Sequence, residues 1–218
     1  MRKICILTVL MAAFILDGYA QGKRKIGITG GVASVSNTRG DYTENDNGSI
    51  FQYSYSSLIS YSGGLVFNFP VGKSMSIRPE LLYTQKGATI KANDDTDSWE
   101  NEVNINYIEL PLNILFNAPG KNGKFMIGGG PYAAYAIDGV VKFGSDGSES
   151  EIFFDDNPTE ITANNFDYGI NLMAGYQLKG GFFFNLRYAQ GLNDVFTGST
   201  TNIKNKNSLI GLNIGFMF

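Results

Sequence analysis

The sequence predicts an all-β fold, an eight-stranded antiparallel up-and-down transmembrane β-barrel with short periplasmic turns and longer extracellular loops. Three observations support this prediction. Apolar side chains recur at every second position in eight segments, short connections alternate with long ones, and no stretch after residue 20 is apolar for long enough to form a membrane helix. An even number of strands also brings both ends of an antiparallel ring to the same side.

The first twenty residues show the pattern of a secretory signal peptide. Arg2 and Lys3 precede an apolar run over residues 4–16, and small residues, Gly18 and Ala20, follow it. Cys5, the only cysteine, lies at the start of the apolar run, whereas a lipid-modified cysteine would follow it. We therefore expect a cleaved signal peptide at 1–20 and an outer membrane β-barrel domain at 21–218, without a disulfide or a lipid anchor.

Eight segments combine apolar alternation with β-branched and aromatic residues and are flanked by turn residues. In chain order they are residues 24–35, 58–69, 73–90, 103–117, 123–142, 165–179, 181–192 and 207–218. Short turns at 70–73, 119–123 and 179–181 separate long polar loops at 36–57, 91–102, 143–164 and 193–206. This alternation is typical of membrane barrels, whose short turns face the periplasm.

The last strand has a uniformly apolar face, because side chains two residues apart share one side of a strand. That face consists of Ile210, Leu212, Ile214, Phe216 and Phe218. A terminal strand that ends in Phe is similar to the strand by which bacterial outer-membrane barrels are recognised for insertion. The barrel assembly machinery is therefore an expected partner during insertion.

The distribution of charge indicates that the apolar faces point outward, toward lipid. Charged residues make up 17% of the chain, against about 25% in ordinary soluble domains. The sixth and seventh strands carry rows of aromatic and aliphatic side chains that water would solvate poorly: Phe166, Tyr168, Ile170, Leu172, Tyr176, Phe182, Phe184, Leu186 and Tyr188. A lipid exterior accommodates these rows.

The same alternation places five charged residues inside the barrel: Arg78, Glu80, Glu109, Asp167 and Arg187. An eight-stranded barrel has only enough interior space for side chains to fill it. Buried charges persist when they are paired and hydrogen-bonded. We therefore predict an ion-pair network that plugs the lumen, with a proton or ion pathway through these residues as the alternative.

Several sequence blocks resemble the PorT-like outer-membrane barrel family of Bacteroidetes. They follow one another along the mature chain: residues 61–65, 77–87 (Ile-Arg-Pro-Glu-Leu-Leu-Tyr-Thr-Gln-Lys-Gly), 107–112 (Tyr-Ile-Glu-Leu-Pro-Leu), 129–132, 166–169 and 187–192. The resemblance implies an eight-stranded barrel in the outer membrane of a Gram-negative bacterium. Because the family's namesake is associated with protein secretion, it also suggests an accessory role in protein export, although a shared fold does not by itself transfer a function.

The composition excludes several kinds of catalysis and argues against an enzyme. The chain has no histidine, and its one cysteine lies in the predicted signal peptide, so histidine-dependent triads, cysteine nucleophiles and zinc sites with the usual ligands are excluded. A formal net charge of −3 makes nucleic acid an unsuitable partner. We expect no enzymatic activity and no cofactor.

Two long loops are rich in carboxylates. The second loop contains Asp94, Asp95 and Asp97, and the third contains Asp155 and Asp156. Such acidic loops are ordinarily solvated surfaces. The alternative is that their oxygens share divalent cations or bridge through them to lipopolysaccharide, although no 12-residue calcium loop is present.

The sequence therefore predicts an integral outer membrane protein with a filled lumen, which acts as a structural or interaction protein and displays acidic loops outside the cell. Its expected surroundings are outer membrane lipid and lipopolysaccharide, together with envelope proteins whose identity stays open. An accessory component of protein export is the alternative, and a small-solute channel is third.

Overall fold

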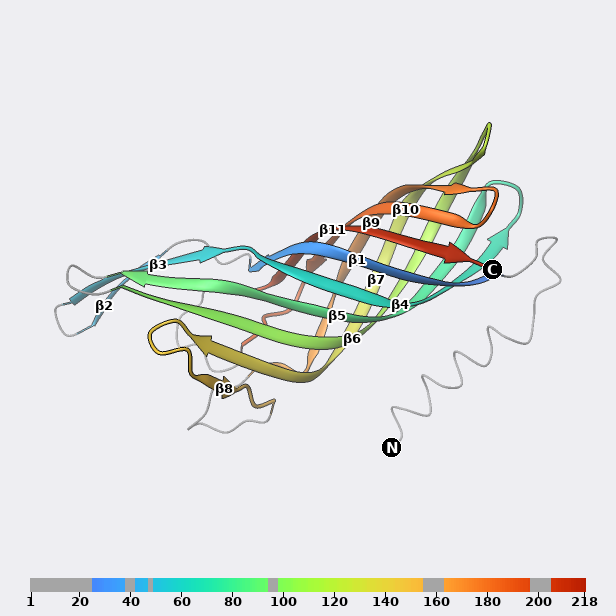
Figure 1. The fold of residues 1–218 in the computed structure, drawn as a ribbon. Helices are drawn as coiled ribbons and strands as arrows, with labels where there is room; N and C mark the ends of the chain where they lie inside the picture. Colours follow the sequence, from blue (N-terminus) through green and yellow to red (C-terminus); the bar gives the residue numbers. More distant parts are fainter. Residues whose placement is uncertain (1–24, 38–41, 47–48, 94–97, 155–162, 197–204) are drawn as a thin grey trace.

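The computed structural model describes residues 25–37, 42–46, 49–93, 98–154, 163–196 and 205–218 (Figure 1). The predicted signal peptide lies outside these residues. The secondary structure of the described ranges is β-strand, joined by turns and bends. No helix within these ranges is long and apolar enough to cross a membrane.

Eight long strands form a closed antiparallel ring within the described ranges. They are β1 (Lys25–Asn37), β4 (Leu58–Val71), β5 (Met75–Asn93), β6 (Ser98–Gly120), β7 (Gly123–Phe143), β9 (Phe166–Leu178), β10 (Phe182–Gly191) and β11 (Asn207–Met217). Each strand pairs with its neighbour in the ring, and β1 closes it by pairing with β11 from Gly27–Met217 to Asn37–Asn207. The eight predicted segments thus correspond to the eight strands of the ring.

Tight connections join the strands at one end of the barrel, called the short-turn end below. Gly72 lies in the β4–β5 turn with φ of 70°, and Gly181 follows β9 with φ of 98°. A side chain at such backbone angles is strained, so glycine suits both turns. The carboxyl terminus lies at this same end, next to the start of β1, since Phe218 N donates a hydrogen bond to Ile26 O.

The opposite end extends further than the sequence predicts, and part of the loop assignment was wrong. Residues 36–57 contain the strands β2 (Tyr42–Asp46) and β3 (Ser49–Ser56), and residues 143–164 contain β8 (Glu149–Glu151). β3 pairs with the far part of β5, β2 pairs with β3, and β8 pairs with β7. The connection predicted at residues 91–102 is shorter than expected, because β5 continues to Asn93 and β6 begins at Ser98.

These additions build an extension sheet, which we define as β2, β3, β8 and the far parts of β5, β6 and β7. Figure 1 shows β3, β5 and β6 running together away from the short-turn end. The polar composition of these segments suggested loops, but their Tyr, Ile, Phe and Thr residues also favour strands. Outside a lipid environment a strand needs no apolar outer face, so the lipid-facing pattern that identified the ring strands was absent.

The faces of the ring strands alternate as predicted. The outward face carries apolar side chains with large exposed fractions, such as Ile28 (51%), Ile127 (61%) and Leu186 (57%). The five apolar residues of the last predicted strand, Ile210, Leu212, Ile214, Phe216 and Phe218, all lie on this face. The inward face is buried and contains many polar side chains.

The barrel interior has three layers. The short-turn end contains an apolar cluster of Val66, Leu115, Met126, Met173, Phe183 and Met217. A larger apolar cluster lies toward the opposite end and includes Val103, Ile105, Val141, Ile152, Ala163 and Val195. Buried polar and charged side chains occupy the space between the clusters. The interior is therefore filled by side chains along its length.

Candidate functional site

The charged residues of the lumen come from four strands of the ring, two on each side of β7. Arg78 and Glu80 lie two residues apart on the inner face of β5, and Glu109, Asp167 and Arg187 lie on the inner faces of β6, β9 and β10. All five are at most 7% exposed. The structure thus places every charged residue predicted for the lumen inside the barrel.

A sixth charge, Lys86, lies on the inner face of β5 and was missed by the sequence analysis. Its side chain is only 2% exposed. The strand parity that placed Arg78 and Glu80 inside also places Lys86 inside, since all three have even numbers on one strand. The five predicted charges sum to one excess negative charge, and Lys86 brings the lumen to neutrality.

Four of these residues form a continuous ion-pair chain, which we call the lumen tetrad: Arg187, Glu109, Lys86 and Asp167. Lys86 Nζ lies 2.8 Å from Glu109 Oε2 and 2.9 Å from Asp167 Oδ2. Arg187 Nη2 pairs with the other oxygen of Glu109. The tetrad joins strands β5, β6, β9 and β10 across the interior and carries no net charge.

Polar side chains from the surrounding strands complete the tetrad. Asp167 Oδ2 accepts hydrogen bonds from Asn207 Nδ2 at 3.1 Å and from the Tyr132 hydroxyl at 3.3 Å. Arg187 Nε donates to Asn171 Oδ1 at 2.8 Å, and Asn171 Nδ2 donates in turn to Asn113 at 2.6 Å. A buried ion pair requires such additional partners, because both charges have lost their hydration.

Aromatic rings also contact the buried cations. Lys86 Nζ lies 4.2 Å from the centre of the Tyr132 ring and 5.4 Å from that of Tyr107. Cations at these distances from a ring centre are attracted by the negative face of the ring. The tyrosines therefore fill space beside Lys86 and stabilise its charge.

Arg78 and Glu80 form a second pair nearer the short-turn end. Arg78 Nε lies 2.9 Å from Glu80 Oε1, and the guanidinium group lies 4.3 Å from the centre of the Phe183 ring. Its Nη1 also lies 3.8 Å from Met126 Sδ. Phe183 and Met126 belong to the apolar cluster at this end, so the second pair is packed directly against that cluster.

The geometry of the lumen favours a structural role for its charges. Every carboxylate in the tetrad and in the second pair lies against a cation, so none of the three is available as an unpaired base. The two apolar clusters enclose the polar layer on both sides. The arrangement therefore cross-links the strands across the interior.

The sequence predicts five loop carboxylates as contacts for divalent cations. Asp94, Asp95, Asp97, Asp155 and Asp156 all lie outside the described residues. Where the structure does describe the chain, it contains no group of three or more Asp, Glu, Cys or His side chains that could hold a metal ion.

Two further acidic residues of these regions lie on strands and form exposed ion pairs, so they were wrongly assigned to loops. Glu100, on β6, lies 2.9 Å from Lys91, and Glu149, on β8, lies 3.4 Å from Lys142. Both lysines flank the acidic segments in the sequence. The strand pairing therefore neutralises part of the acidic charge at the edges of the extension sheet.

Solved structures of several outer membrane proteins are similar to this chain. Ail, the attachment invasion locus protein of Yersinia pestis, solved in complex with the heparin analogue sucrose octasulfate, is 13% identical, with a TM-score of 0.45 and coverage of 90% of this chain and 100% of Ail. Neisserial surface protein A is 8% identical, with a TM-score of 0.46 and the same coverage. OprG from Pseudomonas aeruginosa is 14% identical, with a TM-score of 0.44 and coverage of 93% of this chain and 99% of OprG.

A comparison with protein families identifies the family of the chain. No curated protein matches the sequence significantly. Residues 19–197 match the family model described as the outer membrane protein beta-barrel domain. This match covers more than half of the chain and includes strands β1 to β10 of the ring. The chain therefore belongs to the outer membrane protein beta-barrel domain family, and its location is the outer membrane.

Proposed function

We propose that this protein acts through its surface, as a structural or interaction barrel that holds the extension sheet outside the cell. The observation that carries the proposal is the contrast between a filled interior and an enlarged outer end. The tetrad and the two apolar clusters occupy the lumen, whereas β5 and β6 continue beyond the ring and pair with β3 and β7.

A small-solute channel fits this interior poorly. A permeating ion would have to cross an apolar cluster on each side of the tetrad, and removing a charge from water without a partner is very costly. The neutral tetrad also offers no excess charge that would attract one sign of ion. In the same way, the pairing of each lumen carboxylate with a cation supports the proposal that the protein is not an enzyme and uses no cofactor.

The finer assignments also belong to this proposal. We propose that residues 1–20 direct export and are then removed, and that the barrel assembly machinery recognises the strand ending at Phe218. Lipid then surrounds the outward face, and lipopolysaccharide surrounds the extension sheet. The PorT-like resemblance, and with it an origin in Bacteroidetes, rests on the sequence blocks quoted above.

Conductance and crosslinking test the proposal together. We expect the purified barrel in planar lipid bilayers to show no stable conductance steps, and reproducible steps would overturn the filled-lumen part of the proposal. In intact cells, a photocrosslinking residue at Glu100, which is exposed on the extension sheet, is compared with one at Phe125, which is exposed on the lipid face.

The crosslinking arms separate the roles. An interaction role predicts protein adducts from position 100 and lipid adducts from position 125. Adducts with components of the export machinery would favour the accessory role in export. The cells are grown both alone and together with other bacterial species. If neither position forms protein adducts under either condition, the interaction role is wrong.

A further inference from the structure

A small cavity opens at the short-turn end of the barrel, on the side of the apolar cluster that faces away from the tetrad. It has a volume of about 270 Å³. Its polar lining comes from four strands of the ring and one turn: Lys25 on β1, Asn68 on β4, Lys124 on β7, Gln177 on β9, and Lys179 after β9. Strands far apart in the sequence thus build a single pocket.

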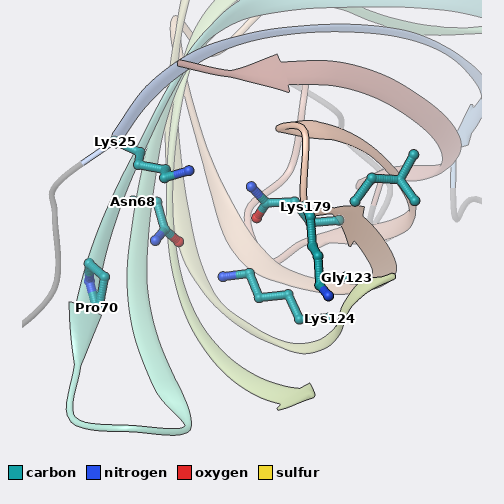
Figure 2. Close-up of a pocket in the computed structure, with 8 residues that line it drawn as sticks. Lys25, Asn68, Pro70, Gly123, Lys124 and Lys179 are labelled. Atoms are coloured by element: carbon teal, nitrogen blue, oxygen red, sulfur yellow. The ribbon is translucent and has the colours of Figure 1, made fainter. Parts of the chain in front are cut away.

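The pocket is strongly cationic. Lys25, Lys124 and Lys179 line it, and its lining includes no acidic side chain. None of these lysines forms an ion pair with another residue that the structure describes, whereas all three buried cations of the lumen do. Figure 2 shows the side chains of Lys25 and Lys124 directed into the same space, with Asn68 between them.

Two buried amides provide an independent indication of a ligand. Asn68 is 6% exposed and Gln177 is 7% exposed, so both are more than nine-tenths buried. Neither side chain makes a hydrogen bond to the rest of the described chain, although both line the cavity. Their amide atoms are not among the fully enclosed ones, so they are open to water or to a ligand inside the cavity. Unpartnered amide donors beside uncompensated ammonium groups match the requirements of an oxyanion.

The floor of the pocket is formed by the apolar cluster that closes the lumen at the short-turn end. The guanidinium of Arg78 is packed on Phe183, within the apolar cluster that closes the lumen at this level. An anion that enters from the short-turn end therefore meets positive charge and then a closed apolar layer.

We propose that this pocket binds an oxyanion, a phosphate or carboxylate group, presented from the periplasmic side. The short turns of an outer membrane barrel face the periplasm. The cavity volume lies just below the roughly 300–1,000 Å³ of pockets that enclose whole drug-sized ligands. It therefore suits one charged group of a larger molecule, such as a lipid phosphate or the free carboxylate of a cell-wall peptide.

Titration with inorganic phosphate and with acetate tests the site, using the full-length barrel in zwitterionic nanodiscs. Amide and lysine NMR signals of the lining residues report binding. We expect saturable shifts, and we expect the double variant Lys25→Gln/Lys124→Gln to weaken binding by about tenfold or more, because it removes two charge-assisted hydrogen bonds. Lys121→Gln is the matched control, since Lys121 is exposed at the same end but does not line the cavity.

The outcomes are distinct. The absence of saturable binding for both anions would overturn the proposal. Equal weakening in the Lys121→Gln variant would also overturn it, because general attraction to a basic surface would then explain the binding. Competition by phosphatidylglycerol added to the nanodiscs identifies a lipid source, whereas competition by a soluble cell-wall peptide with free carboxylates identifies a peptide source.

Discussion

Replacing Lys86 with methionine removes the cation that two buried carboxylates share. Lys86 Nζ lies within 2.9 Å of both Glu109 and Asp167, and the lysine is 1% exposed. In the variant, Glu109 retains Arg187, but Asp167 retains only hydrogen bonds from neutral groups. The two carboxylates then also repel each other without an ammonium between them.

The expected cost follows from this loss. Removing one partner of a buried ion pair destabilises a protein by about 3–5 kcal/mol, because the remaining charge is buried without compensation. Since about 1.4 kcal/mol corresponds to a factor of ten, the unfolding equilibrium constant should rise by roughly two to three and a half orders of magnitude. Urea unfolding of the refolded barrel in lipid vesicles, followed by tryptophan fluorescence, measures the change.

A matched control and a double variant make the measurement specific. Lys91→Met removes a lysine that also lies 2.9 Å from its partner, Glu100, but both side chains are about half exposed, so the cost should be at most about 1 kcal/mol. Lys86→Met combined with Asp167→Asn should cost less than the sum of the single changes by about 1–3 kcal/mol. A cost equal to that of Lys91→Met, or strictly additive effects in the double variant, would refute the reasoning.

Two further substitutions test the lipid face and the packing of the lumen. Leu212→Arg, at the middle of the exposed face of β11, should lower the free energy of unfolding in vesicles by about 2–4 kcal/mol. Ile26→Arg, near the short-turn end, should lower it by at most about 1 kcal/mol. Equal losses would contradict the membrane placement. Gly215→Ala would place a Cβ 2.3 Å from both Ile28 O and Phe183 Cζ and should cost about 1–3 kcal/mol. Gly30→Ala, whose Cβ meets nothing closer than 3.7 Å, serves as the control. Phe183→Leu relieves the contact with the ring but not the contact with the backbone, so it should restore only part of the lost stability, and no difference between the two alanine variants would argue against this packing.

The ring strands could be predicted from the sequence because lipid imposes a two-residue period on them. A residue such as Leu186 must face outward, so Arg187 and Asn185 on either side must face inward. The same reasoning applies to Lys86, which lies on the same face of its strand as Arg78 and Glu80. The five charged residues predicted for the lumen also carried one excess negative charge, which indicated that a cation was missing.

Other features depend on contacts that a single strand does not reveal. Glu109 pairs with both Lys86 and Arg187 only because β5, β6 and β10 lie at particular places in the ring. The extension sheet lacks a lipid face, so β3 could not be distinguished from a polar loop. The pocket at the short-turn end joins Lys25 and Lys124, nearly one hundred residues apart, through strand pairing that no local pattern specifies.

The pairing of β1 with β11 has a consequence for the way the protein reaches its folded state. Gly27 lies opposite Met217. One edge of β1 pairs with β4 and one edge of β11 pairs with β10, so within the ring the remaining edges of β1 and β11 pair with each other. Until β11 has been synthesised and delivered, β1 and β10 both present unpaired backbone groups, which lipid cannot satisfy. A contact over this sequence separation is also slow to form. The ring must therefore be completed in one late step, and the chain must be kept from pairing with other strands during its passage through the periplasm.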